Sequence, residues 1–193
     1  MCSQLVMCIR QSCALLILLV LTGCAGTSVV SKNELLVPAH KLDSVRVIWV
    51  DNHSMPYETS ILFNTYTPKK YSEADKAAIL APYRSESFQV MGQLLSFFSE
   101  QVVSKVRGQL EKNNVSDGND VVLELFPVSI HHAVNGGRRV HVRATLKQGR
   151  DSMEMWSATI EAHGPKDDTN ELLLDNFVST LMDELKKAGW LDS

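Results

Sequence analysis

All four cysteines of this 193-residue chain lie in its first 24 positions, at Cys2, Cys8, Cys13 and Cys24. Everything after Cys24 must therefore fold without a disulfide and without a cysteine for a metal site or a nucleophile. An apolar run over residues 14–20 precedes Cys24, and Arg10 is the only charge before it. A bilayer-spanning helix needs about 20 apolar residues, so this shorter run predicts an export signal.

The run Leu21-Thr22-Gly23-Cys24 resembles the lipobox of bacterial lipoprotein precursors. The resemblance implies that the signal peptide 1–23 is removed, that the Cys24 thiol takes a diacylglycerol, and that the new amine is acylated. Each buried methylene contributes about 0.8 kcal/mol, so several acyl chains such as palmitate hold a protein firmly at a bilayer. The alternatives are an uncleaved amino-terminal anchor and an ordinary signal peptide with a chance cysteine.

The residue directly after the lipobox cysteine is Ala25 and not an aspartate. By the same resemblance, this favours the outer membrane, facing the periplasm, in a source with two membranes. The mature chain from Cys24 carries a formal charge of −4, because removing Arg10 lowers the full-chain value of −3 by one. A mildly acidic body gives no electrostatic reason to bind nucleic acid.

The remainder of the chain predicts a lipid-anchored tether over residues 24–43 and one domain over 44–193. An irregular segment, 51–85, interrupts the domain, and Ser72 with Asp75 predicts the cap of a short helix there. Period-2 and period-3.6 apolar patterns predict the regular elements, which are strands near 45–50, 121–126, 139–147 and 156–162 and helices near 86–113 and 169–187. Pro127 indicates an edge position or a bulge.

This order, β-α-β-β-β-α, predicts an α+β fold in which two amphipathic helices pack on one face of a four-stranded mixed sheet. The layout resembles the small α/β domain of periplasmic envelope-assembly lipoproteins, including the amino-terminal domain of the Tol-system β-propeller protein. Gly92 and Gly108, within the first long helix, indicate close packing.

His131, His132 and His141 form the one histidine cluster. A hairpin turn at Asn135-Gly136 would bring His131 opposite His141, where the imidazoles could hold zinc with a third ligand such as Glu124 or Asp151. Arg139 and Arg143 disfavour a cation there, so no metal and no cofactor are expected.

Catalytic motifs are missing from the sequence. There is no Gly-x-Ser-x-Gly elbow, and Asp51-Asn52-His53-Ser54 are neighbours of the kind that seldom form a triad. The sequence therefore predicts a non-enzymatic protein.

We expect an envelope accessory or assembly factor that binds a protein partner. The alternative is a periplasmic ligand-binding module for lipid, glycan or metal. All four tyrosines lie in residues 51–85, and basic side chains alternate along the strand near 139–147. The candidate partner-binding residues are Tyr66, Tyr71, Tyr83, Arg139, His141 and Arg143.

Overall fold

The structure, a computed structural model, describes residues 26–35, 41–60, 72–134, 137–148, 153–165 and 167–192. The signal peptide, Cys24, Tyr66, Tyr71 and the turn at Asn135-Gly136 lie outside the described residues. Within these ranges, no helix has both the length and the apolar character needed to cross a bilayer.

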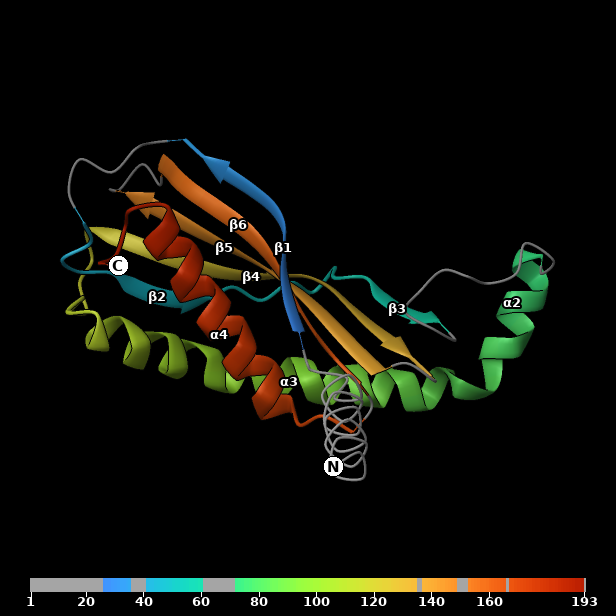
Figure 1. Ribbon diagram of the computed structural model, residues 1–193. Helices are drawn as coiled ribbons and strands as arrows, with labels where there is room; N and C mark the ends of the chain where they lie inside the picture. The colour runs from blue at the N-terminus through green and yellow to red at the C-terminus, as the bar shows by residue number, and fades with distance from the viewer. Residues whose placement is uncertain are drawn as a thin grey trace, which may run out of the picture.

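The fold is an α+β architecture in which three strands precede α2 and α3, and three more precede α4 (Figure 1). In chain order the elements are β1 (Gly26–Glu34), β2 (Arg46–Trp49), β3 (Tyr57–Ser60), α2 (Glu73–Leu80), the 3-10 turn η1 (Ala81–Tyr83), α3 (Arg84–Lys112), β4 (Val121–Ala133), β5 (Gly137–Gln148), β6 (Met153–Gly164) and α4 (Asn170–Lys187).

One mixed sheet organises the fold. Its strand order is β1-β6-β5-β4-β2, and β3 pairs with the second half of β4, beyond β2. The predicted α+β class is confirmed, whereas the predicted number of four strands is wrong because the sheet has six. The additional strands are β1 and β3, and both are edge strands with no strict apolar alternation in their sequences.

The tether predicted for residues 24–43 is wrong over Gly26–Glu34. These residues form β1, which pairs antiparallel with β6. The hydroxyl of Thr27 contacts the hydroxyl of Thr180 on α4. Leu42, which also lies in the predicted tether, is buried in the core. Small and polar residues can form an edge strand because only one side of it needs a partner, so their composition was misleading.

Helices α3 and α4 lie side by side on one face of the sheet and enclose the core. Phe98 of α3 meets Phe177 of α4 edge to face, with ring centroids 6.0 Å apart. Trp156 of β6 is also fully buried in the core. The apolar period of residues 86–113 predicts a core-facing stripe of Phe88, Met91, Leu95, Phe98, Val102, Val106 and Leu110. The prediction is confirmed for the buried members Met91, Phe98, Val102, Val106 and Leu110. It is wrong for Phe88, which is 55% exposed, because the neighbouring Ser87 is the residue of this turn that faces the sheet, with its Oγ 2.8 Å from His132 Nδ1 of β4.

Two local predictions are confirmed, the cap at Ser72 and the bulge at Pro127. Ser72 and Asp75 form a capping box at α2, and the structure adds a cap at Thr169, whose side chain accepts from the Leu172 amide of α4. A register shift between Pro127 and Ser129 marks a bulge in β4. The prediction of close packing at Gly92 and Gly108 is wrong, since a Cβ at either position would meet nothing within 4 Å.

Candidate functional site

The sheet has a second face, opposite α3 and α4, that we call the open face. Strand alternation sends Val140, Val142 and Ala144 of β5 into the core, so the intervening residues Arg139, His141 and Arg143 project to the open face. This confirms the predicted alternation of β5. These side chains are only partly exposed to solvent. The exposed fraction is 27% for Arg139, 20% for His141 and 47% for Arg143.

Glu161 of β6 explains the low exposure at one end of this face. Its carboxylate is hydrogen-bonded to His141 Nε2 at 2.9 Å. Two further groups lie at ion-pair distance from it, Arg139 Nη1 at 3.3 Å and His163 Nδ1 at 3.1 Å. We call these four residues the Glu161 cluster. The Glu161 side chain is only 12% exposed, so its charge is compensated almost entirely by protein groups.

Ser129 extends the cluster onto β4. Its Oγ lies 2.8 Å from His141 Nδ1, so Ser129, His141 and Glu161 form a continuous hydrogen-bonded chain. The residue types match a serine–histidine–acid triad, which the sequence analysis did not find. The bulge at Pro127 creates the alignment by bringing Ser129 opposite His141. Pro127 was the available signal, although a bulge predicts no particular partner.

Two features distinguish the hydrogen-bonded series Ser129–His141–Glu161 from a catalytic triad. Glu161 is shared with Arg139 and His163, so its carboxylate is not dedicated to orienting His141. The strands around Ser129 are paired in the sheet, so their amides are largely used in ladder hydrogen bonds and are not directed at an oxyanion.

The predicted histidine cluster is divided by the sheet. His131 pairs across the ladder with Arg139, so the predicted pairing of His131 with His141 is wrong by two residues. Ala133 pairs with Gly137, which leaves a three-residue connection where a two-residue turn was predicted.

His132 lies on the helix face, buried, with its Nδ1 2.8 Å from Ser87 Oγ of α3. The three candidates His131, His132 and His141 therefore do not converge. Among the described residues, no group of three histidine or acidic side chains has the geometry to hold a metal ion. Burial lowers the pKa of His131 below its usual value, and Arg139 also disfavours the charged imidazolium.

The other end of the open face carries further ion pairs. Arg143 Nη2 lies 3.5 Å from Glu154 Oε1, and Ser157 donates to the same carboxylate at 2.7 Å. Lys147 pairs with Glu124 at 2.5 Å. Positive and negative side chains thus alternate across three strands, with Arg143 as the most exposed cation of the predicted set.

A second surface lies where α2, η1 and the start of α3 extend beyond the sheet, and we call this part the arm (residues 72–88). Tyr83 is 42% exposed and Phe88 55%. Phe88 contacts Tyr57 of β3, with ring centroids 5.7 Å apart. Of the predicted tyrosines, Tyr83 is therefore on an exposed surface, and Tyr66 and Tyr71 are outside the described residues.

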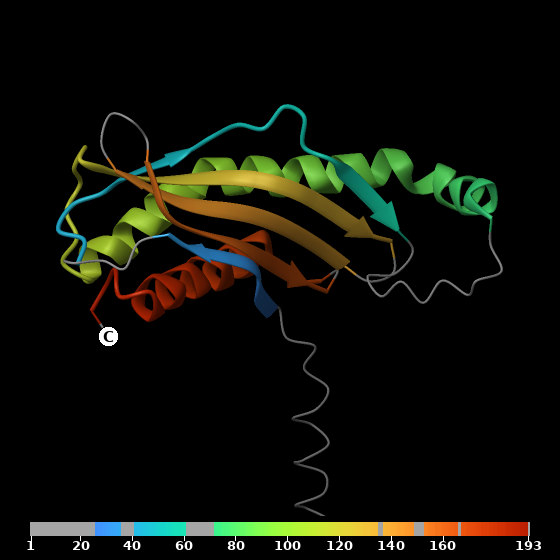
Figure 2. The ribbon, with the colours of Figure 1, turned by 90° about the horizontal axis from the view of Figure 1, so that it is seen from above.

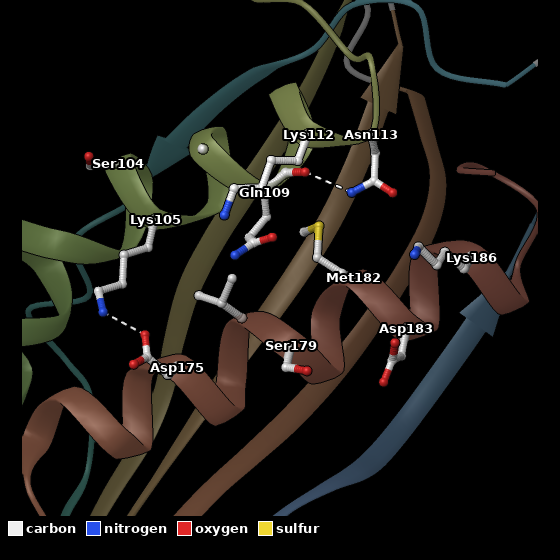
Figure 3. A pocket seen from close by; sticks show the side chains of 12 residues that line it. Ser104, Lys105, Gln109, Lys112, Asn113, Asp175, Ser179, Met182, Asp183 and Lys186 are labelled. Atoms are coloured by element: carbon white, nitrogen blue, oxygen red, sulfur yellow. Dashed lines mark hydrogen bonds and ion pairs between the residues drawn. The ribbon is translucent and has the colours of Figure 1, made fainter. Parts of the chain in front are cut away.

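A groove of about 640 Å³ runs between α3 and α4 on the side away from the sheet (Figure 3). Lys105 reaches across it to Asp175 at 2.5 Å and Glu171 at 3.0 Å, which raises the pKa of Lys105. Met182 and Val178 form part of its floor. The groove has charged walls, unlike an apolar cavity between helices and sheet.

Comparisons with solved structures find matches at low sequence identity and with TM-scores below 0.5. A PelC dodecamer from Paraburkholderia phytofirmans is 14% identical, with a TM-score of 0.45 over 82% of this chain and 96% of its own. Protein XCC0632 from Xanthomonas campestris is 14% identical, with a TM-score of 0.36 over 86% and 92%. Lipoprotein GNA1162 from Neisseria meningitidis is 12% identical, with a TM-score of 0.28 over 75% and 99%.

No protein-family model matches the chain, and no curated protein matches it. Similarities of this size assign the chain to no family.

Proposed function

We propose that this chain is a membrane-anchored envelope lipoprotein, facing the periplasm, that acts as a non-catalytic accessory or assembly factor and binds a protein partner. The observation that carries the proposal is Cys24, which follows an apolar signal core and two small residues in the order of a lipobox. The outer membrane is the proposed location, on the basis of Ala25.

The anchor is tested by metabolic labelling. Cells expressing the full chain are grown with labelled palmitate, with and without the lipoprotein-signal-peptidase inhibitor globomycin. We expect label in the wild-type protein, accumulation of the precursor with the inhibitor, and no label in Cys24→Ser. Wild-type protein that sediments with envelopes without label would overturn the lipid anchor.

The open face is the proposed partner surface. It offers a broad sheet surface on which charged groups are already arranged in pairs, and Arg143 remains nearly half exposed. Such a surface favours a polar, reversible contact with another protein, in which charge complementarity sets the specificity. The Glu161 cluster would supply rigidity at one end of that surface.

A crosslinking experiment tests the surface. A photoreactive residue at Arg143 is compared with one at Lys112, an exposed lysine beside the α3–α4 groove on the opposite side of the molecule. We expect a discrete crosslinked protein from Arg143 in intact cells, and Arg143→Glu should abolish co-purification that Lys112→Glu preserves. Equal retention of the partner by both variants would remove the open face from the proposal.

The non-catalytic part is tested at Ser129. A fluorophosphonate probe labels activated serines, and we expect the wild-type protein to react no faster than Ser129→Ala. Stoichiometric labelling that disappears in Ser129→Ala and in His141→Ala would make the chain a hydrolase and overturn this part of the proposal.

The α3–α4 groove favours the alternative, a ligand-binding module. A small molecule that remains bound through purification of the wild-type protein, and is lost from Ser179→Trp, would support that function over partner binding.

A further inference from the structure

The anchor and the folded domain are separated by very little chain. β1 begins at Gly26, so only Ala25 lies between it and Cys24. A polypeptide spans at most about 3.6 Å per residue, so Gly26 lies within about 7 Å of the Cys24 Cα whatever the conformation between them. If Cys24 is lipidated as proposed above, Gly26 must lie close to the headgroups.

β1 cannot act as a replacement tether without losing its contacts. It pairs with β6 from Gly26↔His163 to Glu34↔Trp156, and Lys32 lies 3.5 Å from the buried Glu184 of α4. Gly26 itself is packed against His163, because a Cβ there would lie 2.7 Å from its Nε2. The domain is therefore held at the bilayer by its own edge strand.

The arm lies at the same end of the sheet as Gly26. One row of paired residues crosses five strands from β1 to β3, through Gly26, His163, Arg139, His131 and Glu58. Strands are about 4.8 Å apart, so this row is about 19 Å long. Figure 2 shows that the ends of these strands line up along one side of the molecule, with α2 continuing that line.

This end also exposes apolar side chains. Phe88 is 55% exposed, Tyr83 42%, Tyr57 38% and Ile79 37%. Tyrosine combines an apolar ring with a polar hydroxyl, and aromatic residues are enriched where protein meets the headgroup region of a bilayer. Exposed aromatic groups are costly in water, and the anchor places a bilayer next to this end.

We propose that the arm and the Gly26 end of the sheet rest on the bilayer that holds the lipid, with Phe88, Tyr83, Tyr57 and Ile79 at the headgroup level. The inference depends on the proposed lipidation at Cys24. Nearby charges are mixed, with Arg84 beside Glu86, so the contact comes from the anchor and the apolar side chains and not from net charge. The open face would then stand perpendicular to the bilayer, available to a partner.

The test measures distance from the bilayer at two sites. Cys24 is the one cysteine of the mature chain, so single-cysteine probes can be added to the lipidated full chain. Glu86→Cys reports on the arm, and Gln148→Cys reports on the opposite end of β5; both positions are exposed. Each is labelled with a fluorophore and reconstituted in phosphatidylethanolamine–phosphatidylglycerol vesicles containing a nitroxide-headgroup lipid. We expect at least threefold stronger quenching at position 86.

Paired variants assign the contact to the aromatic side chains. Phe88→Ser with Tyr83→Ser should reduce quenching at position 86 to the level at position 148, while the protein still floats with the vesicles. Met153→Ser is the matched control, because Met153 is 51% exposed at the opposite end, and it should change nothing. A flexible insertion of twelve glycines and serines after Ala25 should weaken the quenching at both sites.

The outcomes separate this inference from the proposed function. Protein that fails to float with vesicles would show that the lipid anchor is wrong. Floating protein with equal quenching at the two positions would overturn the membrane contact alone. Quenching at position 86 that disappears when solubilised envelope proteins are reconstituted with the chain would mean that a protein occupies the arm, and would also overturn it.

Discussion

Lys32 of β1 lies 3.5 Å from the carboxylate of Glu184 on α4, and Lys187 donates to the same carboxylate at 2.6 Å. Glu184 is 5% exposed. Burial alone would raise its pKa, but the two lysines more than offset burial, so the pKa of Glu184 is lowered. The Lys32–Glu184 ion pair therefore links β1, the strand next to Cys24, to helix α4.

We expect Glu184→Gln to destabilise the protein by about 1 kcal/mol, because it removes a charged acceptor from two lysines. The carboxyl group has a lower pKa in the folded state, so its stabilisation is full above its unfolded pKa, about 4.3, and is lost as the pH falls through the folded value. Urea unfolding at a series of pH values should therefore show the full difference from wild type at pH 7, and this difference should decrease progressively as the pH falls below about 4.3.

Hydrogen exchange provides the local readout for the same change. The amides of β1 should exchange faster in Glu184→Gln, whereas those of β5 should not. Asp183→Asn is the control, since Asp183 is the exposed neighbour of Glu184 on α4. Unchanged protection in β1 would show that the ladder with β6 holds the strand without help from α4.

Much of the fold could be predicted because long apolar periods dominate it. Phe98 and Phe177 lie on stripes that only a helix packed on a core would produce, and β5 alternates cleanly between core and open face. β1 could not be predicted in this way, because an edge strand of small polar residues has the composition of a linker. Its partner β6 is far away in the chain, and only the folded sheet brings the two together.

The candidate site depended on register, which the sequence predicted less well. The connection before Gly137 is one residue longer than predicted, and His131 pairs with Arg139, two residues from the predicted His141; the bulge at Pro127 brings Ser129 opposite His141. The Glu161 cluster follows from the register of β5 with β6, in which His141 pairs with Glu161 and Arg139 with His163. A side-chain period of two fixes the face on which each residue lies, but turn length and bulges decide which residues of that face pair on neighbouring strands.

Replacing either of two glycines by alanine should change the stability of the protein in opposite directions. Gly137 has φ of +112°, and a Cβ there would lie 2.1 Å from the carbonyl oxygen of Gly164, a backbone atom. Gly108 lies within α3, where an added Cβ meets nothing within 4 Å. We expect Gly137→Ala to destabilise by more than about 2 kcal/mol and Gly108→Ala to stabilise by about 0.5–1 kcal/mol. Thermal unfolding of both variants measures this, and equal shifts would contradict it.

His131 should titrate below an ordinary histidine. Its pKa is lowered by burial and by Arg139, so between the folded value and about 6.5 the unfolded chain binds more protons at this site. Stability from this residue therefore rises with pH across that window and is constant above it. Histidine ring signals in an NMR titration should show the low midpoint, and His131→Asn should flatten the acid side of the stability profile. A midpoint at or above 6.5 would contradict the argument.

Two phenylalanines on α3 distinguish core from surface. Phe98 is fully buried against Phe177, and Phe88 is 55% exposed on the arm. We expect Phe98→Ala to destabilise by about 3–5 kcal/mol, because it leaves a cavity between the helices. Phe88→Ala should destabilise by less than about 1 kcal/mol, since its side chain is more than half exposed and its ring contact is with the exposed Tyr57. Chemical denaturation of the unlipidated Cys24→Ser protein compares the two without a bilayer. If Phe88→Ala were as damaging as Phe98→Ala, the arm would belong to the core, and its aromatic side chains would not be free to meet a membrane.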